Sequence, residues 1–267
     1  MDYKLIALDI DGTLTNSKKE ITPRTRFALI EAQQKGKKII LASGRHPIGI
    51  EPIAKDLMLD RFGGFIMAFN GSKIINCETK EVVATKLFPL EYLPDIVSVL
   101  KNSNITINTY DDKNIISDNK VNDYSYVERD IIKTNMVVVD DFVSAVRFPI
   151  NKILLAGEPD EIDEYKEILS LRYDGLLEVY KSAPYFLEIM PFGVTKGSML
   201  PILLDKLKIK REELMAFGDN YNDLTMVGYA GYGVAMGNAE EDLKKIADYV
   251  CESNDDDGIA KTLEKIL

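Results

Sequence analysis

The sequence predicts an α/β protein in which a parallel-sheet domain is interrupted by an inserted α+β domain. Near both ends of the chain, short apolar runs alternate with helical patterns, which is typical of a parallel sheet covered by helices. Between them, polar and apolar residues alternate as in antiparallel hairpins. We expect a discontinuous sheet domain over 1–84 and 190–267, an insert over 85–189, and a functional site at their boundary.

The composition is that of a globular protein with small-molecule partners. Of the 267 residues, 46% are hydrophobic and 28% are charged, so a sizeable core is possible and one or two domains are expected. The net charge of -10 disfavours binding to nucleic acid or to an anionic membrane. Small substrates are therefore the expected partners.

No targeting segment or membrane span is recognisable, so the sequence predicts a cytoplasmic protein. The two cysteines, Cys77 and Cys251, lie far apart, and neither has a second Cys or a His at metal-ligand spacing. A disulfide framework and a zinc site are both disfavoured. The oligomeric state leaves no signal in the sequence.

The first predicted elements are a strand, a helix and two more strands. The apolar run 4–10 predicts a strand buried on both faces, with Asp9 at its carboxyl end. Thr22 and Pro23 fit the N-cap and first position of a helix that ends before Gly36. Further buried strands are predicted over 37–42 and 64–69.

Polar residues follow each of these three strands: Asp9 and Asp11, then Ser43, Gly44 and Arg45, then Asn70 and Gly71. In open α/β sheets, ligands bind outside the carboxyl ends of the strands. This clustering therefore predicts a site at that edge of the sheet, and ordinary loop polarity is the alternative.

The insert starts with a helical pattern over 90–102, followed by the alternating run 105–110 and a turn at 111–113. A similar order of helix, strand and strand suggests a pseudo-repeat over 160–171, 176–181 and 184–190. The patterns of the sheet domain then return, with a helix after Thr195, a strand over 214–217, a helix after Tyr221 and a short run over 232–236.

Asp9 and Asp11 are candidates for covalent and acid-base catalysis. Their carboxylates flank a single residue at the end of the predicted strand, and we expect a different role for each. A carboxylate at a strand end can attack phosphorus, while a second one protonates the leaving oxygen and later activates water. Gly12 allows the chain to bend between them; a polar turn after a strand is the alternative interpretation.

A second acidic cluster, Gly218-Asp219-Asn220-x-Asn222-Asp223, follows the run 214–217 and predicts a cation site. Mg²⁺ prefers oxygen ligands and often uses one or two carboxylates, so Asp9 and Asp219 form a plausible pair. Helix capping by Asn220 or Asn222 is an alternative that is compatible with the metal role.

Ser43 and Gly44 offer a hydroxyl and a backbone amide for phosphoryl oxygens, and Lys196 offers a positive charge near a predicted helix start. His46, the only histidine, precedes Pro47 and fits a helix start better than a catalytic base. Arg45 fits a cation that faces the substrate or pairs with an Asp, or a structural salt bridge.

Taken together, LIALDIDGTL, SGR, FNG, GVTKG and GDNYND resemble the motifs of the haloacid dehalogenase (HAD) superfamily, above all the Cof-type sugar-phosphate phosphatases with a class IIB cap. The resemblance covers essentially the whole chain. It implies a Rossmann-like parallel-sheet core, an α+β cap domain that determines specificity, and Mg²⁺-dependent hydrolysis of small phosphomonoesters through a phosphoaspartate.

The resemblance also implies a role for each motif residue. Asp9 is the expected nucleophile and Mg²⁺ ligand, Asp11 the general acid and base whose carbonyl also binds Mg²⁺, and Asp219 the remaining ligand. The residues expected to contact the phosphoryl group are Ser43, Gly44, Lys196 and Asn222. Behind them we expect Asp223 and Thr13. Beside the leaving group we expect Asn70 and Gly71. Further substrate-side candidates are Arg45 and the cap residues Tyr185, Phe186 and Glu188.

Two other functions are compatible with the same fold. A phosphomutase would return the phosphoryl group to a substrate, and a silent sensor would only bind phosphorylated ligands. The complete set of acids and the lysine weighs against the sensor, and dehalogenation needs neither Mg²⁺ nor Asp11. Nucleotides and phosphorylated cofactors stay open as substrates beside sugar phosphates.

Overall fold

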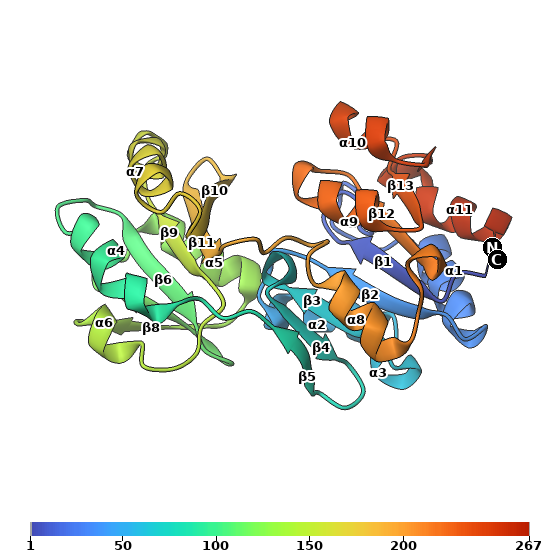
Figure 1. The fold of residues 1–267 in the computed structure, drawn as a ribbon, viewed down its shortest axis with the longest axis horizontal. Coiled ribbons are helices and arrows are strands. Elements are labelled where there is room, and N and C mark those ends of the chain that lie inside the picture. Colours follow the sequence, from blue (N-terminus) through green and yellow to red (C-terminus); the bar gives the residue numbers. More distant parts are fainter. Residues whose placement is uncertain (1, 267) are drawn as a thin grey trace. The chain divides into compact units, whose positions relative to one another are not determined.

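The computed structural model describes residues 2–266, and the chain divides into two compact units (Figure 1). The core consists of Met1–Thr85 and Thr195–Leu267, and the cap consists of Lys86–Val194. The sequence places these boundaries after residues 84 and 189. The second boundary lies further along because the backbone N–H of Gly193 still donates to Glu178 of the cap, at 2.9 Å.

The core is built on an eight-stranded sheet with the order β14-β13-β12-β1-β2-β3-β4-β5. The central strand β1 (Leu5–Asp9) pairs in parallel with β12 (Leu214–Gly218) and β2 (Lys38–Ala42). The other strands are β3 (Phe65–Ala68), β4 (Lys73–Asn76), β5 (Val82–Thr85), β13 (Tyr232–Ala235) and β14 (Tyr249–Val250). Blue and orange segments of Figure 1, far apart in the sequence, thus lie side by side, and the predicted α/β class is confirmed.

The central strands of this sheet are apolar on both faces because helices cover both. Leu5 and Ala7 of β1 pack in one cluster with α8 (Leu200–Leu207), while Ile6 and Leu8 point to the opposite face. All four side chains are fully buried. The remaining helices of the core are α1 (Pro23–Gln34), α2 (Pro47–Asp56), α3 (Leu59–Phe62), α9 (Leu224–Tyr229), α10 (Glu241–Ile246) and α11 (Gly258–Ile266).

Two helix starts are confirmed residue by residue. Thr22 caps α1 by accepting a hydrogen bond from the backbone N–H of Thr25 at 3.2 Å, with Pro23 in the first helical position. His46 caps α2 in the same way, because its Nδ1 accepts from the N–H of Ile48 at 3.1 Å. Its imidazole therefore has a structural task at the start of α2.

The cap has a six-stranded sheet with the order β10-β11-β9-β6-β7-β8. Its strands are β6 (Thr106–Tyr110), β7 (Asn114–Asp118), β8 (Asn135–Val139), β9 (Ile153–Ala156), β10 (Leu177–Ala183) and β11 (Phe186–Pro191). Its helices are α4 (Leu93–Val99), α5 (Asp123–Ile132), α6 (Phe142–Ala145) and α7 (Pro159–Arg172). The antiparallel hairpins β6-β7 and β10-β11 each follow a helix, which is the order that the pseudo-repeat predicts.

One face of the cap sheet carries its hydrophobic core. Alternate residues such as Ile107, Ile153 and Leu187 point to this face and pack with Ile96 of α4 and Leu169 of α7. The pairing of β8 with β7 is parallel, and α5 makes the crossover between them.

No helix among residues 2–266 combines the length and the apolar character that a membrane crossing requires.

Both thiols are expected to be unreactive in the folded protein. Burial raises the pKa of Cys77 to about 12 and that of Cys251 to about 11, so almost no thiolate is present at pH 8. With Ellman's reagent at pH 8, we expect no rapid colour in buffer and two equivalents of thiol in guanidinium chloride. Rapid titration of either thiol in buffer would contradict the burial of that side chain.

Candidate active site

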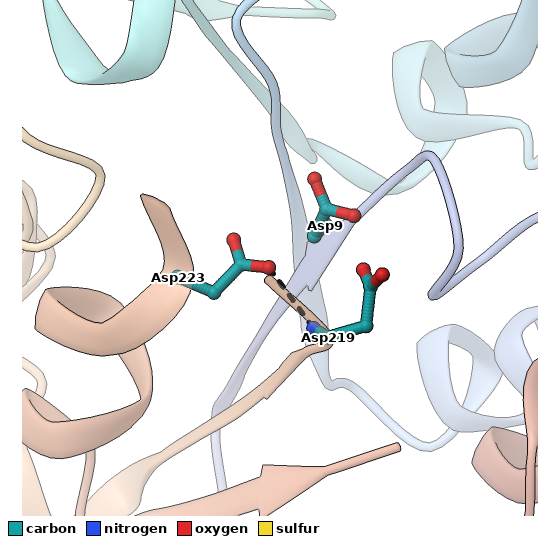
Figure 2. Close-up of side chains that lie close together, drawn as sticks. All are labelled: Asp9, Asp219 and Asp223. Atoms are coloured by element: carbon teal, nitrogen blue, oxygen red, sulfur yellow. Dashed lines mark hydrogen bonds between the residues drawn. The ribbon is translucent and has the colours of Figure 1, made fainter. Parts of the chain in front are cut away.

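Three carboxylates meet at the carboxyl end of the core sheet (Figure 2). Asp9 ends β1, Asp219 directly follows β12, and Asp223 closes the 3₁₀ turn Tyr221–Asp223. One oxygen of each lies within 4.8 Å of the others. They converge because β1 and β12 are adjacent parallel strands, whose carboxyl ends lie at the same edge of the sheet.

Lys196 is completely buried among these acids. Its Nζ lies 2.5 Å from Oδ1 of Asp9 and 2.6 Å from Oδ1 of Asp223. Burial alone would lower the pKa of Lys196, but the attraction of Asp223 and Asp9 outweighs it and the pKa is raised. The ammonium group is therefore positively charged in this site.

Burial also raises the pKa of Asp9 well above its usual range; Lys196 opposes this shift, and the nearby charges of Asp223 and Asp219 add to it. The pKa of Asp219 is raised as well, again mainly by burial. Three carboxylates thus share one ammonium group. Such a cluster of negative charge is unfavourable without a further cation. Because the atoms that could bind a cation here are all carboxylate oxygens, the residues fit a hard metal ion.

Asp223 differs from the other two acids because both of its oxygens already have partners. Oδ1 pairs with Lys196, and Oδ2 accepts from the backbone N–H groups of Asp219 and Asn220 at 3.0 and 3.1 Å. Its contacts hold the lysine and the loop after β12 in place. The expected role of Asp223 behind the phosphoryl-binding residues stays a prediction.

Gly12 and Thr13 shape the surroundings of Asp219. The hydroxyl of Thr13 donates to Oδ1 of Asp219 at 2.7 Å. Gly12 has a φ of +92°, and a Cβ at this position would lie 2.3 Å from Oδ2 of the same carboxylate. Position 12 therefore requires glycine for two reasons, its positive φ and the lack of space for a Cβ beside Asp219.

Asp11 points its carboxylate at Arg45 and Lys19 instead of joining the acidic cluster. Arg45 donates from Nε at 2.9 Å and from Nη2 at 2.7 Å, and Lys19 donates at 3.1 Å. Burial would raise the pKa of Asp11, but these two cations outweigh burial and the pKa is lowered. Arg45 is thus an Asp-pairing cation, one of the roles that the sequence leaves open.

The predicted phosphate-binding residues come together around Asn70. Its Oδ1 accepts from Nδ2 of Asn222 at 3.2 Å, and its N–H donates to the carbonyl of Ser43 at 2.9 Å. A Cβ on Gly44 would lie 3.1 Å from Nδ2 of Asn70. Ser43, Gly44, Asn70 and Asn222, from three separate loops, therefore form one cluster.

The loop that carries Asn70 has an unusual backbone. Phe69, Asn70 and Gly71 have φ values of 52°, 50° and 107°, and all three residues are buried. Left-handed conformations cost energy in residues other than glycine and persist where the surroundings impose them. At Gly71 a Cβ would lie 2.2 Å from the carbonyl oxygen of Thr195, so this loop packs closely against the segment that carries Lys196.

Glu188 lies in the cap, in a buried polar group of its own. In β11 it is 4% exposed, pairs with Lys152 at 3.2 Å and accepts from the hydroxyl of Tyr180 at 3.1 Å. Tyr185 stacks on Tyr124 with ring centroids 5.0 Å apart. Phe186 is buried beside Tyr185.

Sequence reasoning missed several contacts of the site. Lys19 reaches Asp11, and Asn238 donates from Nδ2 to the carbonyl of Gly12 at 2.8 Å. Lys152, the partner of Glu188, was also not predicted. Each is a single polar residue outside any motif, so no pattern in one sequence distinguishes it from ordinary surface polarity.

A parallel α/β core with acids, a buried lysine and amide groups at its carboxyl end offers the groups that can hold and transfer the phosphoryl group of a phosphate ester. The family model of haloacid dehalogenase-like hydrolases matches residues 6–263. The chain therefore belongs to this family, as the sequence motifs predict, and it is a HAD phosphatase of the Cof type.

Relatives of known structure or name cover nearly the whole chain. A haloacid dehalogenase-like hydrolase from Bacteroides thetaiotaomicron is 42% identical, with a TM-score of 0.94 over 100% of both chains. A sugar phosphatase of HAD subclass IIB is 28% identical, with a TM-score of 0.82 over 98% of both chains. The 5-amino-6-(5-phospho-D-ribitylamino)uracil phosphatase of Bacillus subtilis is 30% identical over 98% of this chain and 95% of its own.

Proposed function

We propose that this phosphatase hydrolyses small phosphomonoesters, sugar phosphates above all, with Mg²⁺ and through a phosphoaspartate on Asp9. The observation that carries the proposal is the buried contact between Asp9 and Lys196 at the carboxyl end of β1. A carboxylate held there by an ammonium group is fixed in position for attack, and the lysine can neutralise charge on the phosphoryl group. Ser43, Gly44 and Asn222 would bind the phosphoryl oxygens.

The proposed cycle has two displacements at phosphorus. In the first, a carboxylate oxygen of Asp9 forms a bond to phosphorus while the bond to the ester oxygen breaks, and Asp11 gives that oxygen its proton. In the second, water gives a proton to Asp11 and attacks phosphorus, which releases inorganic phosphate and restores Asp9. Asp11 thus ends each turnover in the protonation state in which it began.

The pairing of Asp11 with Arg45 and Lys19 supports the second half of this cycle. An ionised carboxylate is the form that accepts a proton from water, and the two cations keep Asp11 ionised. The first half needs a protonated Asp11. We infer that Asp11 leaves Arg45 before it protonates the ester oxygen.

The donor set favours Mg²⁺ as the cofactor. Because Asp223 is engaged with Lys196 and two backbone N–H groups, Asp9 and Asp219 are the carboxylates that would hold the ion, with the main-chain carbonyl of Asp11. When bound, Mg²⁺ supplies positive charge that offsets the clustered acids and the phosphoryl oxygens.

Two of the relatives support a substrate with a phosphorylated polyol. One is named a sugar phosphatase, and the other is named for a substrate with a phosphorylated ribityl chain. We propose that such metabolites are its substrates in the cytoplasm, the location that the sequence predicts. The cap would select among them.

Phosphate release from a panel of sugar phosphates, nucleotides and an aryl phosphate tests this proposal. We expect turnover with Mg²⁺, highest on sugar or sugar-alcohol phosphates, abolition by EDTA, and recovery when Mg²⁺ is returned in excess. Turnover that persists in EDTA would refute the metal dependence. A substrate converted to its phosphate isomer without free phosphate would instead establish a mutase.

A further inference from the structure

Asn70 connects three loops of the core site. It lies in the loop after β3, and its backbone N–H donates to the carbonyl of Ser43 after β2 at 2.9 Å. Its side-chain Oδ1 accepts from Nδ2 of Asn222, in the loop after β12, at 3.2 Å. Asn70 is only 7% exposed, whereas Asn222 is an exposed residue. A buried residue thus holds the amide of a residue on the surface, which would otherwise sample several rotamers.

The backbone at position 70 restricts which residues fit there. Asn70 has a φ of 50° and a ψ of 34°, which is the left-handed region. Glycine adopts this conformation readily, and asparagine and aspartate adopt it more often than other residues. Of these three, asparagine brings an oxygen acceptor without a negative charge that would repel a phosphate ester. The amide is therefore what distinguishes Asn70 from a glycine that would suit the backbone equally well.

Gly44 leaves the space that this amide occupies. A Cβ on Gly44 would lie 3.1 Å from Nδ2 and 3.2 Å from Oδ1 of Asn70. Both distances are shorter than the separation at which non-bonded atoms pack best. A larger residue at position 44 would therefore displace the amide of Asn70. The loops after β2 and β3 are thus fitted to each other around this one amide group.

The contact with Asn70 also determines which way the amide of Asn222 faces. Oδ1 of Asn70 accepts hydrogen bonds, so it favours the orientation in which Asn222 turns its NH₂ group toward it. The reverse orientation would place two amide oxygens against each other. An amide nitrogen carries two N–H groups, and the second N–H of Asn222 can donate to a phosphoryl oxygen. A reversed amide would remove this donor.

We propose that Asn70 is a positioning residue, which orients the amide of Asn222 so that it donates a hydrogen bond to the phosphoryl group of the substrate. The inference rests on the proposed function, in which Asn222 binds the phosphoryl oxygens. It assigns Asn70 to the part of the substrate that all phosphomonoesters share, whereas the family resemblance places Asn70 beside the leaving group. An amide that is oriented before the substrate arrives loses less side-chain entropy on binding.

The affinity of the whole protein for inorganic phosphate, measured by calorimetry with Mg²⁺ present, tests the inference without turnover. Asn222→Ala should weaken binding about tenfold, as expected for one hydrogen bond to a charged group. Asn70→Gly should weaken it by a smaller factor, because the amide of Asn222 keeps its donors but loses its fixed orientation. The double variant should bind as Asn222→Ala does, since Asn70 acts through Asn222. Lys208→Gly, at an exposed left-handed position after α8, is the matched control and should bind as the wild type does.

Asn70→Asp tests the hydrogen bond itself. Aspartate keeps an oxygen acceptor and tolerates the left-handed backbone, so Asn222→Ala should still weaken phosphate binding about tenfold in this background. In the Asn70→Gly background, the same substitution should have a smaller effect.

Kinetics on several substrates test the part of the substrate on which Asn70 acts. Asn70→Gly should lower kcat/KM by the same factor for sugar phosphates and for an aryl phosphate, because the phosphoryl group is common to both. A loss confined to sugar phosphates would show a contact with the leaving group and overturn the inference. Phosphate affinity that Asn70→Gly leaves unchanged, or losses that multiply in the double variant, would also overturn this inference alone. A wild type that binds no phosphate would overturn the proposed function as well.

Discussion

Asp9→Asn is expected to lower kcat for phosphate release by more than about 10⁴-fold, because an amide cannot form the acyl phosphate. Asparagine has nearly the same shape, and Lys196 keeps its contact with Asp223, so the fold should be retained. The measurement is the initial rate on the best substrate of the panel with saturating Mg²⁺. Asp60→Asn, at an exposed aspartate of α3, is the matched control and should keep the wild-type rate.

The same variant has a second expected effect, on stability without metal. Because the pKa of Asp9 in the folded protein is raised above its usual 3.8, the wild type loses stability as the pH rises from that value through the raised pKa. Asp9→Asn lacks this loss. In urea with EDTA, the free energy of unfolding should therefore decline less between pH 4 and pH 8 in the variant.

The two effects can fail separately. A variant that retains more than about 1% of the wild-type rate would exclude Asp9 as the nucleophile. A steeper decline of stability with pH in Asp9→Asn would instead show that the charge of Asp9 is favourable in the metal-free protein. The first result concerns the chemistry, and the second concerns the electrostatics of the cluster.

Lys196→Met should destabilise the protein by about 3 to 5 kcal/mol, because it leaves two buried carboxylates without their cation. Methionine occupies a similar volume, so the loss reports the charge and its hydrogen bonds more than packing. The measurement is the free energy of unfolding in urea with EDTA. Phosphate release should be lost as well, since Lys196 contacts the attacking carboxylate.

Lys19→Met is the control for this prediction. Its ammonium group also contacts an aspartate but its side chain is 66% exposed, and an ion pair of this kind contributes less than about 1 kcal/mol. Combining Lys196→Met with Asp223→Asn should recover part of the stability, because one uncompensated charge is removed. Equal losses of unfolding free energy in Lys19→Met and Lys196→Met would show that burial does not determine how much each ammonium group stabilises the protein.

The parallel core could be predicted because its strands are short, continuous apolar runs between clear turn residues. β1, β2 and β3 lie within one residue of the predicted ranges, since burial on both faces gives them an unmistakable composition. The hairpin β4-β5 was missed because its strands are half exposed and mix polar with apolar residues. β8 and β9 were missed too, because runs of five and four residues are too short to show a clear period.

The residues of the candidate site could be predicted from the sequence, but the contacts between their side chains could not. Asp9, Lys196 and Asp219 stand in recognisable motifs, and parallel strands bring such motifs to one edge. The contact of Lys196 with Asp9 and that of Asp11 with Arg45 join residues far apart in the sequence. Both contacts depend on the directions in which the side chains point. Charge and spacing along the chain carry no information on these directions.

The position of the cap in the chain determines when the site can form during synthesis. Asp9 and Lys196 are 187 positions apart, and β12, a neighbour of β1, starts only at Leu214. The whole cap sheet, in contrast, lies within Lys86–Val194. During translation, the cap can therefore fold first, while the edge of β1 that pairs with β12 still has no partner strand. A nascent chain that stalls before β12 would therefore expose this edge of β1.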